Sequence, residues 1–82
     1  MQITLSKQAI KFLKEQTRKT QEKISEQIKK IPAKAPELDI KPYHGNNADY
    51  RLKLGSIRVL YDDDGYIVDV IRIGYRGDVY KK

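Results

Sequence analysis

The sequence predicts an α+β domain in which an N-terminal strand and a helical hairpin precede an antiparallel β meander that packs on the helices. Two observations carry this prediction. Before residue 32, apolar residues recur at helical spacing, and after residue 49 β-branched and aromatic residues dominate. All three prolines fall between these halves. The 82 residues are expected to form one domain, 1–82.

The first helix is expected directly after a short strand at residues 2–5. Ser6 is a good N-cap, and the helix is predicted to run to about Thr17. One side of this helix is apolar and holds Ala9, Ile10, Phe12 and Leu13. On the opposite side four cations form a stripe: Lys7, Lys11, Lys14 and Arg18.

The second helix is expected after a tight corner at residues 18–20, with Thr20 as its N-cap. Ile24, Ile28 and Ile31 follow the i, i+4, i+7 spacing of an amphipathic helix, and Pro32 ends it. The two helices form a hairpin. Residues 32–48 are predicted to be an irregular linker, because three prolines and the sequence HGNN disfavour regular structure.

Three strands are predicted after the linker, at residues 50–54, 57–63 and 66–73. Gly55-Ser56 and Asp64-Gly65 each suit a two-residue hairpin turn. Such turns would pair Lys53 with Arg58, and Val59 with Val70. The face that packs on the helices would then hold Tyr50, Leu52, Leu54, Ile57, Val59, Tyr61, Val68 and Val70. The other face would hold Arg51, Lys53, Arg58, Leu60, Asp69, Ile71 and Ile73.

Three cations on that second face indicate a ligand. Lys53 and Arg58 would lie directly opposite each other, and like charges in that arrangement destabilise a sheet. A phosphate-bearing ligand would explain why they are there. The alternative is a solvated outer face whose long side chains spread apart in water.

The net charge of +6 lies entirely in residues 1–35, which hold nine Lys and Arg against three Glu. This excess favours an anionic partner, either nucleic acid or an acidic protein, with solubility alone as the alternative. No apolar run approaches the roughly 18 residues of a membrane span, so no membrane partner is expected. The absence of cysteine excludes disulfides and fits a cytoplasmic location.

No metal or cofactor is expected. The run Asp62-Asp63-Asp64 is typical of a hairpin tip rather than of a cation site. His44 stands alone between Tyr43 and Gly45, and is interpreted as a surface residue.

The C-terminal half resembles the RelE toxins of bacterial and archaeal toxin–antitoxin pairs. The matching pieces are RLKLGSIRVLY, from Arg51, and IRIGYRGDVY, from Ile71. The order of helices and strands fits as well, so the resemblance covers nearly the whole chain and implies the RelE-like fold of microbial RNases. Two departures stand out: Tyr75 replaces the usual histidine, and Arg51 replaces a lysine of well-studied members.

RelE-like toxins are ribosome-dependent endoribonucleases that cut mRNA in the decoding site and are held inactive by an antitoxin. The resemblance therefore implies three partners: an acidic helical antitoxin, the ribosome and mRNA. It places the catalytic set on Arg51, Lys53, Arg58, Arg76 and Tyr80. The helical stripe would contact ribosomal RNA. A ParE-like toxin that inhibits gyrase and a degenerate module that only binds an antitoxin are the alternatives.

Cleavage through the 2′-OH of RNA needs no metal, but it needs a base, an acid and positive charge on the phosphorane. The arginines stay charged and suit phosphate contact. The base could be Lys53 or Tyr80. Gly74 and Gly77 are expected to let the chain fold back over the cationic face with Arg76 and Tyr80; alternatively, Tyr80 seals a small core.

Overall fold

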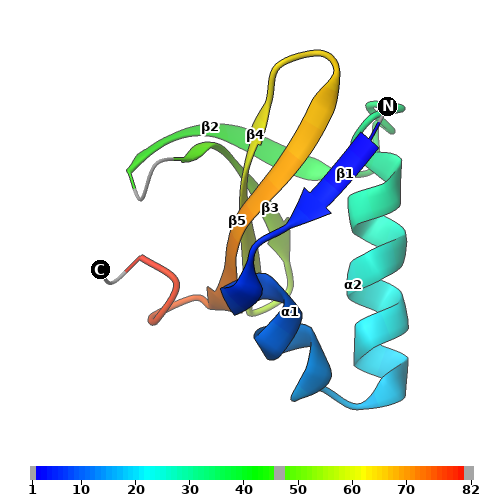
Figure 1. Ribbon diagram of the computed structural model, residues 1–82, viewed down its shortest axis with the longest axis vertical. Coiled ribbons are helices and arrows are strands. Elements are labelled where there is room, and N and C mark those ends of the chain that lie inside the picture. The colour runs from blue at the N-terminus through cyan, green and yellow to red at the C-terminus, as the bar shows by residue number, and fades with distance from the viewer. Residues whose placement is uncertain (1, 46–47, 81–82) are drawn as a thin grey trace.

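The structure, a computed structural model, describes residues 2–45 and 48–80 and confirms the predicted α+β class. Its elements are β1 Gln2–Leu5, α1 Lys7–Lys14, α2 Arg18–Lys30, β2 Asp39–Gly45, β3 Ala48–Leu54, β4 Ile57–Asp63 and β5 Ile67–Tyr75. The five strands form one sheet in the order β1-β5-β4-β3-β2, in which β1 runs parallel to β5 and the other pairs are antiparallel. Both helices lie on one side of the sheet, and the C-terminal segment lies on the other (Figure 1).

The face toward the helices, called the inner face below, carries the main core. Phe12 of α1 and Ile24 and Ile28 of α2 are buried against it. Burial of each such side chain contributes about 1.5–3 kcal/mol. The predicted inner-face residues are confirmed, since all eight belong to this cluster or pack against it: Tyr50, Leu52, Leu54, Ile57, Val59, Tyr61, Val68 and Val70.

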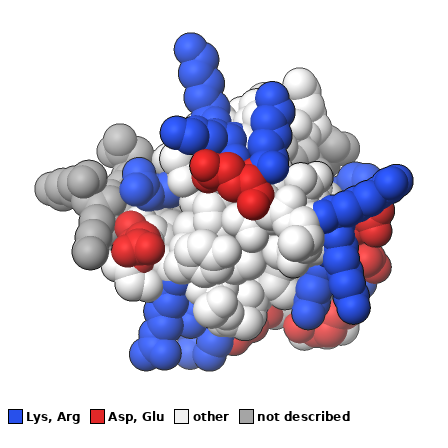
Figure 2. Space-filling model, turned by 90° about the horizontal axis from the view of Figure 1, so that it is seen from below, with Lys and Arg blue, Asp and Glu red and all other residues white. Residues whose placement is uncertain are grey.

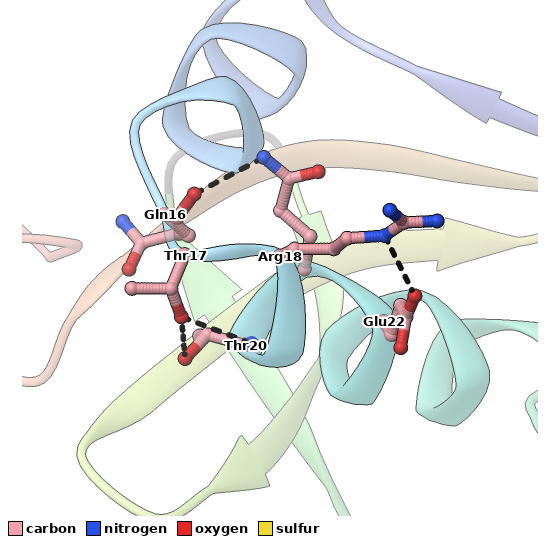
Figure 3. Close-up of polar contacts among 6 residues, drawn as sticks. Gln16, Thr17, Arg18, Thr20 and Glu22 are labelled. Atoms are coloured by element: carbon pink, nitrogen blue, oxygen red, sulfur yellow. Dashed lines mark hydrogen bonds and ion pairs between the residues drawn. The ribbon is translucent and has the colours of Figure 1, made fainter.

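The corner between the helices lies earlier in the chain than the sequence predicted. Ser6 caps α1 as expected, but α1 ends at Lys14 and α2 begins at Arg18. The N-cap of α2 is Thr17, whose hydroxyl accepts a hydrogen bond from the backbone N–H of Thr20 at 3.3 Å (Figure 3). The predicted helix end at Thr17 and the predicted cap at Thr20 are therefore wrong. Of two threonines three residues apart, the first takes the cap position and the second supplies the N–H that it satisfies.

The predicted linker at residues 32–48 is wrong in part, because it contains the edge strand β2. Ile40 pairs with Leu52 and Lys41 pairs with Arg51 across the β2–β3 ladder. Pro42 lies within β2, and an edge strand tolerates a proline because only one of its sides is paired. The ladder is irregular between Pro42 and Gly45.

The first hairpin has the predicted register, in which Lys53 pairs with Arg58. The second does not. Asp63 pairs with Val68 across a loop of four residues, where Asp64 Oδ1 accepts the N–H groups of Tyr66 and Ile67 at 2.8 Å each.

A register shift between Leu60 and Tyr61 then pairs Val59 with Ile73 rather than with Val70. Ile73 consequently lies in the core against the helices and not on the opposite face, as predicted. No helix in residues 2–45 and 48–80 is long and apolar enough to cross a membrane.

Candidate functional site

The outer face of the sheet, opposite the helices, brings together cations from neighbouring strands. Directly paired residues of two strands point to the same face, so Lys53 and Arg58 lie side by side as predicted. The next outward-facing row pairs Lys41 of β2 with Arg51 of β3. Lys41 was not among the predicted site residues, because residues 32–48 were interpreted as a linker.

These cations differ in how the protein holds them. The Arg58 side chain is buried, and its Nη1 donates to the carbonyl oxygens of Gly55 at 2.6 Å and Ile57 at 3.1 Å. Arg51 Nη2 lies 3.6 Å from Asp39 Oδ1. Lys53 is exposed and has no ion-pair partner in the described part of the chain. The face therefore combines two positioned guanidinium groups with one free amine.

The C-terminal segment crosses this face, as the sequence predicted. Val79 is fully buried in a second apolar cluster with Leu60 and Ala48. A Cβ added at Gly74 would lie 3.2 Å from Val79 Cβ, so a larger residue there would require Val79 to shift by a few tenths of an ångström. Gly74 is nevertheless part of β5, and a Cβ at Gly77 would meet nothing within 4 Å. The predicted break therefore reduces to a close contact at Gly74.

Arg76 and Tyr80 are placed by this segment. The backbone N–H of Arg76 donates to Ser56 O at 2.7 Å, which fixes it beside the β3–β4 turn. Tyr80 is 39% exposed, and its ring centroid is 5.5 Å from that of Tyr43 on β2. Val79 is the residue of this segment that is buried in the second cluster, and Tyr80 lies against Tyr43, which packs on that cluster.

Arg72 is a further outer-face cation that the sequence reading missed. It pairs with Leu60 on β4, and its Nε is buried without a hydrogen-bond partner among the described residues. It borders a hollow of about 390 Å³ between α1 and the end of β5, which Phe12 and Tyr75 also line. The predicted register placed Ile71 opposite Arg58, whereas Gly74 occupies that position. This shift is why Arg72 was overlooked.

The predicted cationic stripe is broken at the helix corner. Lys7, Lys11 and Lys14 lie exposed on α1. Arg18 begins α2 instead, and its Nε is 3.3 Å from Glu22 Oε1 (Figure 3). Lys and Arg side chains project from several sides of the molecule around a mostly uncharged middle (Figure 2), so the positive charge is not confined to one helix face.

Acidic residues occupy the other end of the outer face. The Asp49 N–H donates to Asp62 Oδ1 at 2.7 Å, and Asp62 pairs with Asp69 on β5. Burial raises the pKa of Asp62, and the neighbouring carboxylates add to this effect, although the bond from Asp49 opposes it. Asp63 and Asp64 accept backbone N–H groups of their own loop, as a hairpin tip does. Among the described residues no group of three His, Cys, Asp or Glu is placed to hold a metal.

A family model described as the ParE toxin of type II toxin–antitoxin systems, parDE, matches residues 3–80. The chain belongs to this family of toxins. The predicted membership of the RelE/ParE superfamily is thereby confirmed. No curated protein sequence matches the toxin.

Two solved structures share the fold of this toxin. One is the archaeal RelE–RelB complex from Pyrococcus horikoshii OT3, with a TM-score of 0.70 and 22% identity over 95% of this chain and 97% of the other. The second is the RelB–RelE antitoxin–toxin complex from Methanococcus jannaschii, with a TM-score of 0.70 and 22% identity over 90% and 91%. The toxin therefore combines a ParE family match with a RelE-like fold.

Proposed function

We propose that this toxin is a ribosome-dependent endoribonuclease, an mRNA interferase, that cleaves mRNA through the substrate's own 2′-OH. The observation that carries the proposal is the exposed Lys53 amine directly opposite the buried, doubly bonded Arg58. The repulsion between two facing cations destabilises a sheet, whereas a phosphate between them would gain two contacts.

In the proposed reaction the 2′-oxygen attacks the adjacent phosphorus while a base takes its proton. The bond to the 5′-oxygen then breaks, and that oxygen receives a proton, leaving a 2′,3′-cyclic phosphate and a 5′-OH. Arg58 and Arg51 would stabilise the phosphorane, because their positions are fixed before substrate binds. Arg76 would add a third guanidinium. Lys53 or Tyr80 would act as the base.

The proposed regulator is an acidic antitoxin with a helical segment that wraps around the toxin. Both structural neighbours are described as complexes of RelE with RelB. The net charge of +6 suits such a partner electrostatically. The remaining α1 stripe of Lys7, Lys11 and Lys14 is proposed to contact ribosomal RNA.

The deciding experiment is cleavage of mRNA on programmed ribosomes by the purified toxin, with cut sites mapped by primer extension. The parental toxin and Lys29→Ala, which removes an exposed cation from α2, are expected to cut. Lys53→Ala is expected to be inactive while remaining folded. A parental toxin that leaves ribosome-bound mRNA intact would contradict the proposal.

Inhibition of gyrase is the second candidate function, and two observations favour it. The matching family model is that of ParE toxins, and Tyr75 occupies the position where RelE toxins usually carry histidine. A supercoiling assay with purified gyrase separates the candidates. Gyrase inhibition that persists in Lys53→Ala, together with intact mRNA, would select this second function.

A further inference from the structure

We propose that β2 carries a second nucleotide subsite, in which Lys41 binds a phosphate and Tyr43 stacks on a base. This inference rests on the proposed endoribonuclease function and extends it, because it assigns a place to the nucleotide next to the one that is cut. Neither residue belongs to the proposed catalytic set.

Lys41 repeats the charge arrangement of the catalytic row. It is exposed on the outer face and directly opposite Arg51, just as Lys53 is directly opposite Arg58. Successive outward-facing rows of a sheet are about 7 Å apart along the strands. That spacing is comparable to the separation of neighbouring phosphates in an extended RNA strand, so the two rows can hold successive phosphates.

The two rows share little negative charge. Asp39 is the acidic residue in them: it pairs with Lys53 in the ladder and lies 3.6 Å from Arg51. Lys41 has no ion-pair partner among the described residues. Against the four cations of these two rows, the carboxylate of Asp39 leaves an excess of positive charge.

Tyr43 provides a rigid aromatic surface beside these rows. Its side chain packs against the cluster of Ala48, Leu60 and Val79. A Cβ at Gly45 would lie 2.8 Å from Tyr43 Oη, so the Tyr43 ring can occupy its position because Gly45 has no side chain. The ring centroid of Tyr80 lies 5.5 Å away, and the two planes are tilted by 39°. Adjacent aromatic rings next to a cationic surface are typical of proteins that bind single-stranded nucleic acid.

The acidic end of the outer face limits the path that bound RNA can take across the sheet. Asp49, Asp62 and Asp69 lie on this face beyond the cationic rows, and their charges repel a phosphate backbone. Asp49 is the outward-facing residue of β3 after Arg51, so the RNA is expected to turn from the Arg51 row onto the sheet edge, over Lys41 and Tyr43 of β2 and away from β4 and β5.

The test measures kcat and KM for mRNA cleavage on programmed ribosomes. Lys41→Ala and Tyr43→Leu are each expected to raise KM about tenfold with kcat unchanged. For Tyr43 the reason is that stacking on one aromatic ring is worth about 1–3 kcal/mol per base. In a plot of log affinity for mRNA against log salt concentration, Lys41→Ala should also reduce the slope by about 0.7. This is the value for one contact to a phosphate of a single strand. The matched controls are Lys29→Ala on α2 and Tyr66→Leu in the β4–β5 loop, where Tyr66 is 81% exposed.

The outcomes separate this inference from the function on which it rests. If the parental toxin cuts and both β2 variants match their controls, the subsite is wrong and the nuclease function stands. If the parental toxin does not cut, both proposals fall. Tyr43→Phe keeps the ring and is expected to retain the parental KM; an equal loss in the Phe and Leu variants would overturn the stacking role. Melting curves of all variants identify any loss that reflects unfolding.

Discussion

The side-chain amide of Gln8 takes the place of a missing strand at the edge of β5. Its Nε2 donates to Ile73 O at 2.6 Å, and its Oε1 accepts from Ile73 N at 2.8 Å. β1 pairs with β5 only as far as Leu5 opposite Val70, so Gln8 satisfies the backbone where the neighbouring strand has ended. This contact ties α1 to the strand that carries Arg72 and leads into the C-terminal segment.

Gln8→Leu is expected to lower the free energy of unfolding by about 1–3 kcal/mol, because it leaves the N–H and C=O of Ile73 without partners. Urea denaturation monitored by circular dichroism measures the change. Gln27→Leu is the matched control, since Gln27 lies on α2 and is not hydrogen bonded through its side chain in the described structure. Equal midpoints for the two variants would show that water replaces the amide.

Gly74→Ala is expected to displace the C-terminal segment, because the new Cβ would lie 3.2 Å from Val79 Cβ in a packed cluster. The overpacking should cost about 1–3 kcal/mol of stability. Hydrogen exchange of the Val79 N–H, which is bonded to Tyr75 O at 2.9 Å, should accelerate. Gly77→Ala serves as the control and is expected to behave like the parent, as its Cβ meets nothing within 4 Å.

The parts of the fold that the sequence predicted depend on local signals. Ser6 and Pro32 mark helix ends through their own chemistry, and Gly55, with φ of +60°, sets the tight first hairpin. The pairing of Lys53 with Arg58 follows from that turn, which is why this pairing was predicted correctly.

The errors arise where side chains or tertiary contacts override the local signal. The carboxylates of Asp63 and Asp64 stabilise a four-residue loop, and the register shift that follows hides Arg72. Pro42 made β2 look irregular, although the sheet accepts it at its edge, and this concealed Lys41. The alternation of Leu38 and Ile40 with polar residues was the signal that could have revealed the strand.

Lys53→Ala and Arg58→Ala are expected to differ in stability although both lose cleavage. Loss of either cation from the phosphate site should slow cleavage by roughly 100- to 1,000-fold. Lys53 is exposed, so its loss should leave the melting temperature unchanged or slightly raised by relief of repulsion. Arg58 is buried and bonds two carbonyl oxygens, so its loss should lower stability by about 1–3 kcal/mol. Thermal melts beside the cleavage assay test this, and equal stability losses would contradict the assigned environments.

Asp62→Asn is expected to stabilise the toxin at pH 7, by up to roughly 0.5 kcal/mol. Burial raises the pKa of Asp62 above its ordinary value of 3.8, so the folded state disfavours its ionised form. Asn keeps an oxygen to accept the Asp49 N–H. The gain should vanish as the pH falls below about 3.8, where aspartate is protonated in both states.

Asp64→Asn is expected to destabilise the toxin at pH 7, which is the opposite of the effect expected for Asp62→Asn. Hydrogen bonds from the N–H groups of Ile67 and Tyr66 lower the pKa of Asp64, so its ionised form stabilises the fold above its unfolded pKa. This variant should melt lower than the parent at pH 7, and the difference should shrink as the pH falls below 3.8 through the lower pKa of the folded state. Urea titrations at pH 7 and pH 3 measure the free energy of unfolding of both variants. A change of the same sign for Asp62→Asn and Asp64→Asn at pH 7 would contradict the opposite pKa shifts of the two carboxyl groups.

Tyr80 tests what the end of the chain contributes to cleavage. Its ring lies against Tyr43 and the residue is partly exposed, so it can supply stacking, a proton, or both. Tyr80→Phe retains the ring, and stacking is worth about 1–3 kcal/mol per base, whereas Tyr80→Ala loses ring and hydroxyl together. If Phe is active and Ala is inactive on ribosomes, Tyr80 stacks and Lys53 is the base. If both are inactive while ribosome binding persists, the hydroxyl takes part in the chemistry. Full activity of both variants would remove Tyr80 from the site and leave Arg76 as the sole contribution of this segment.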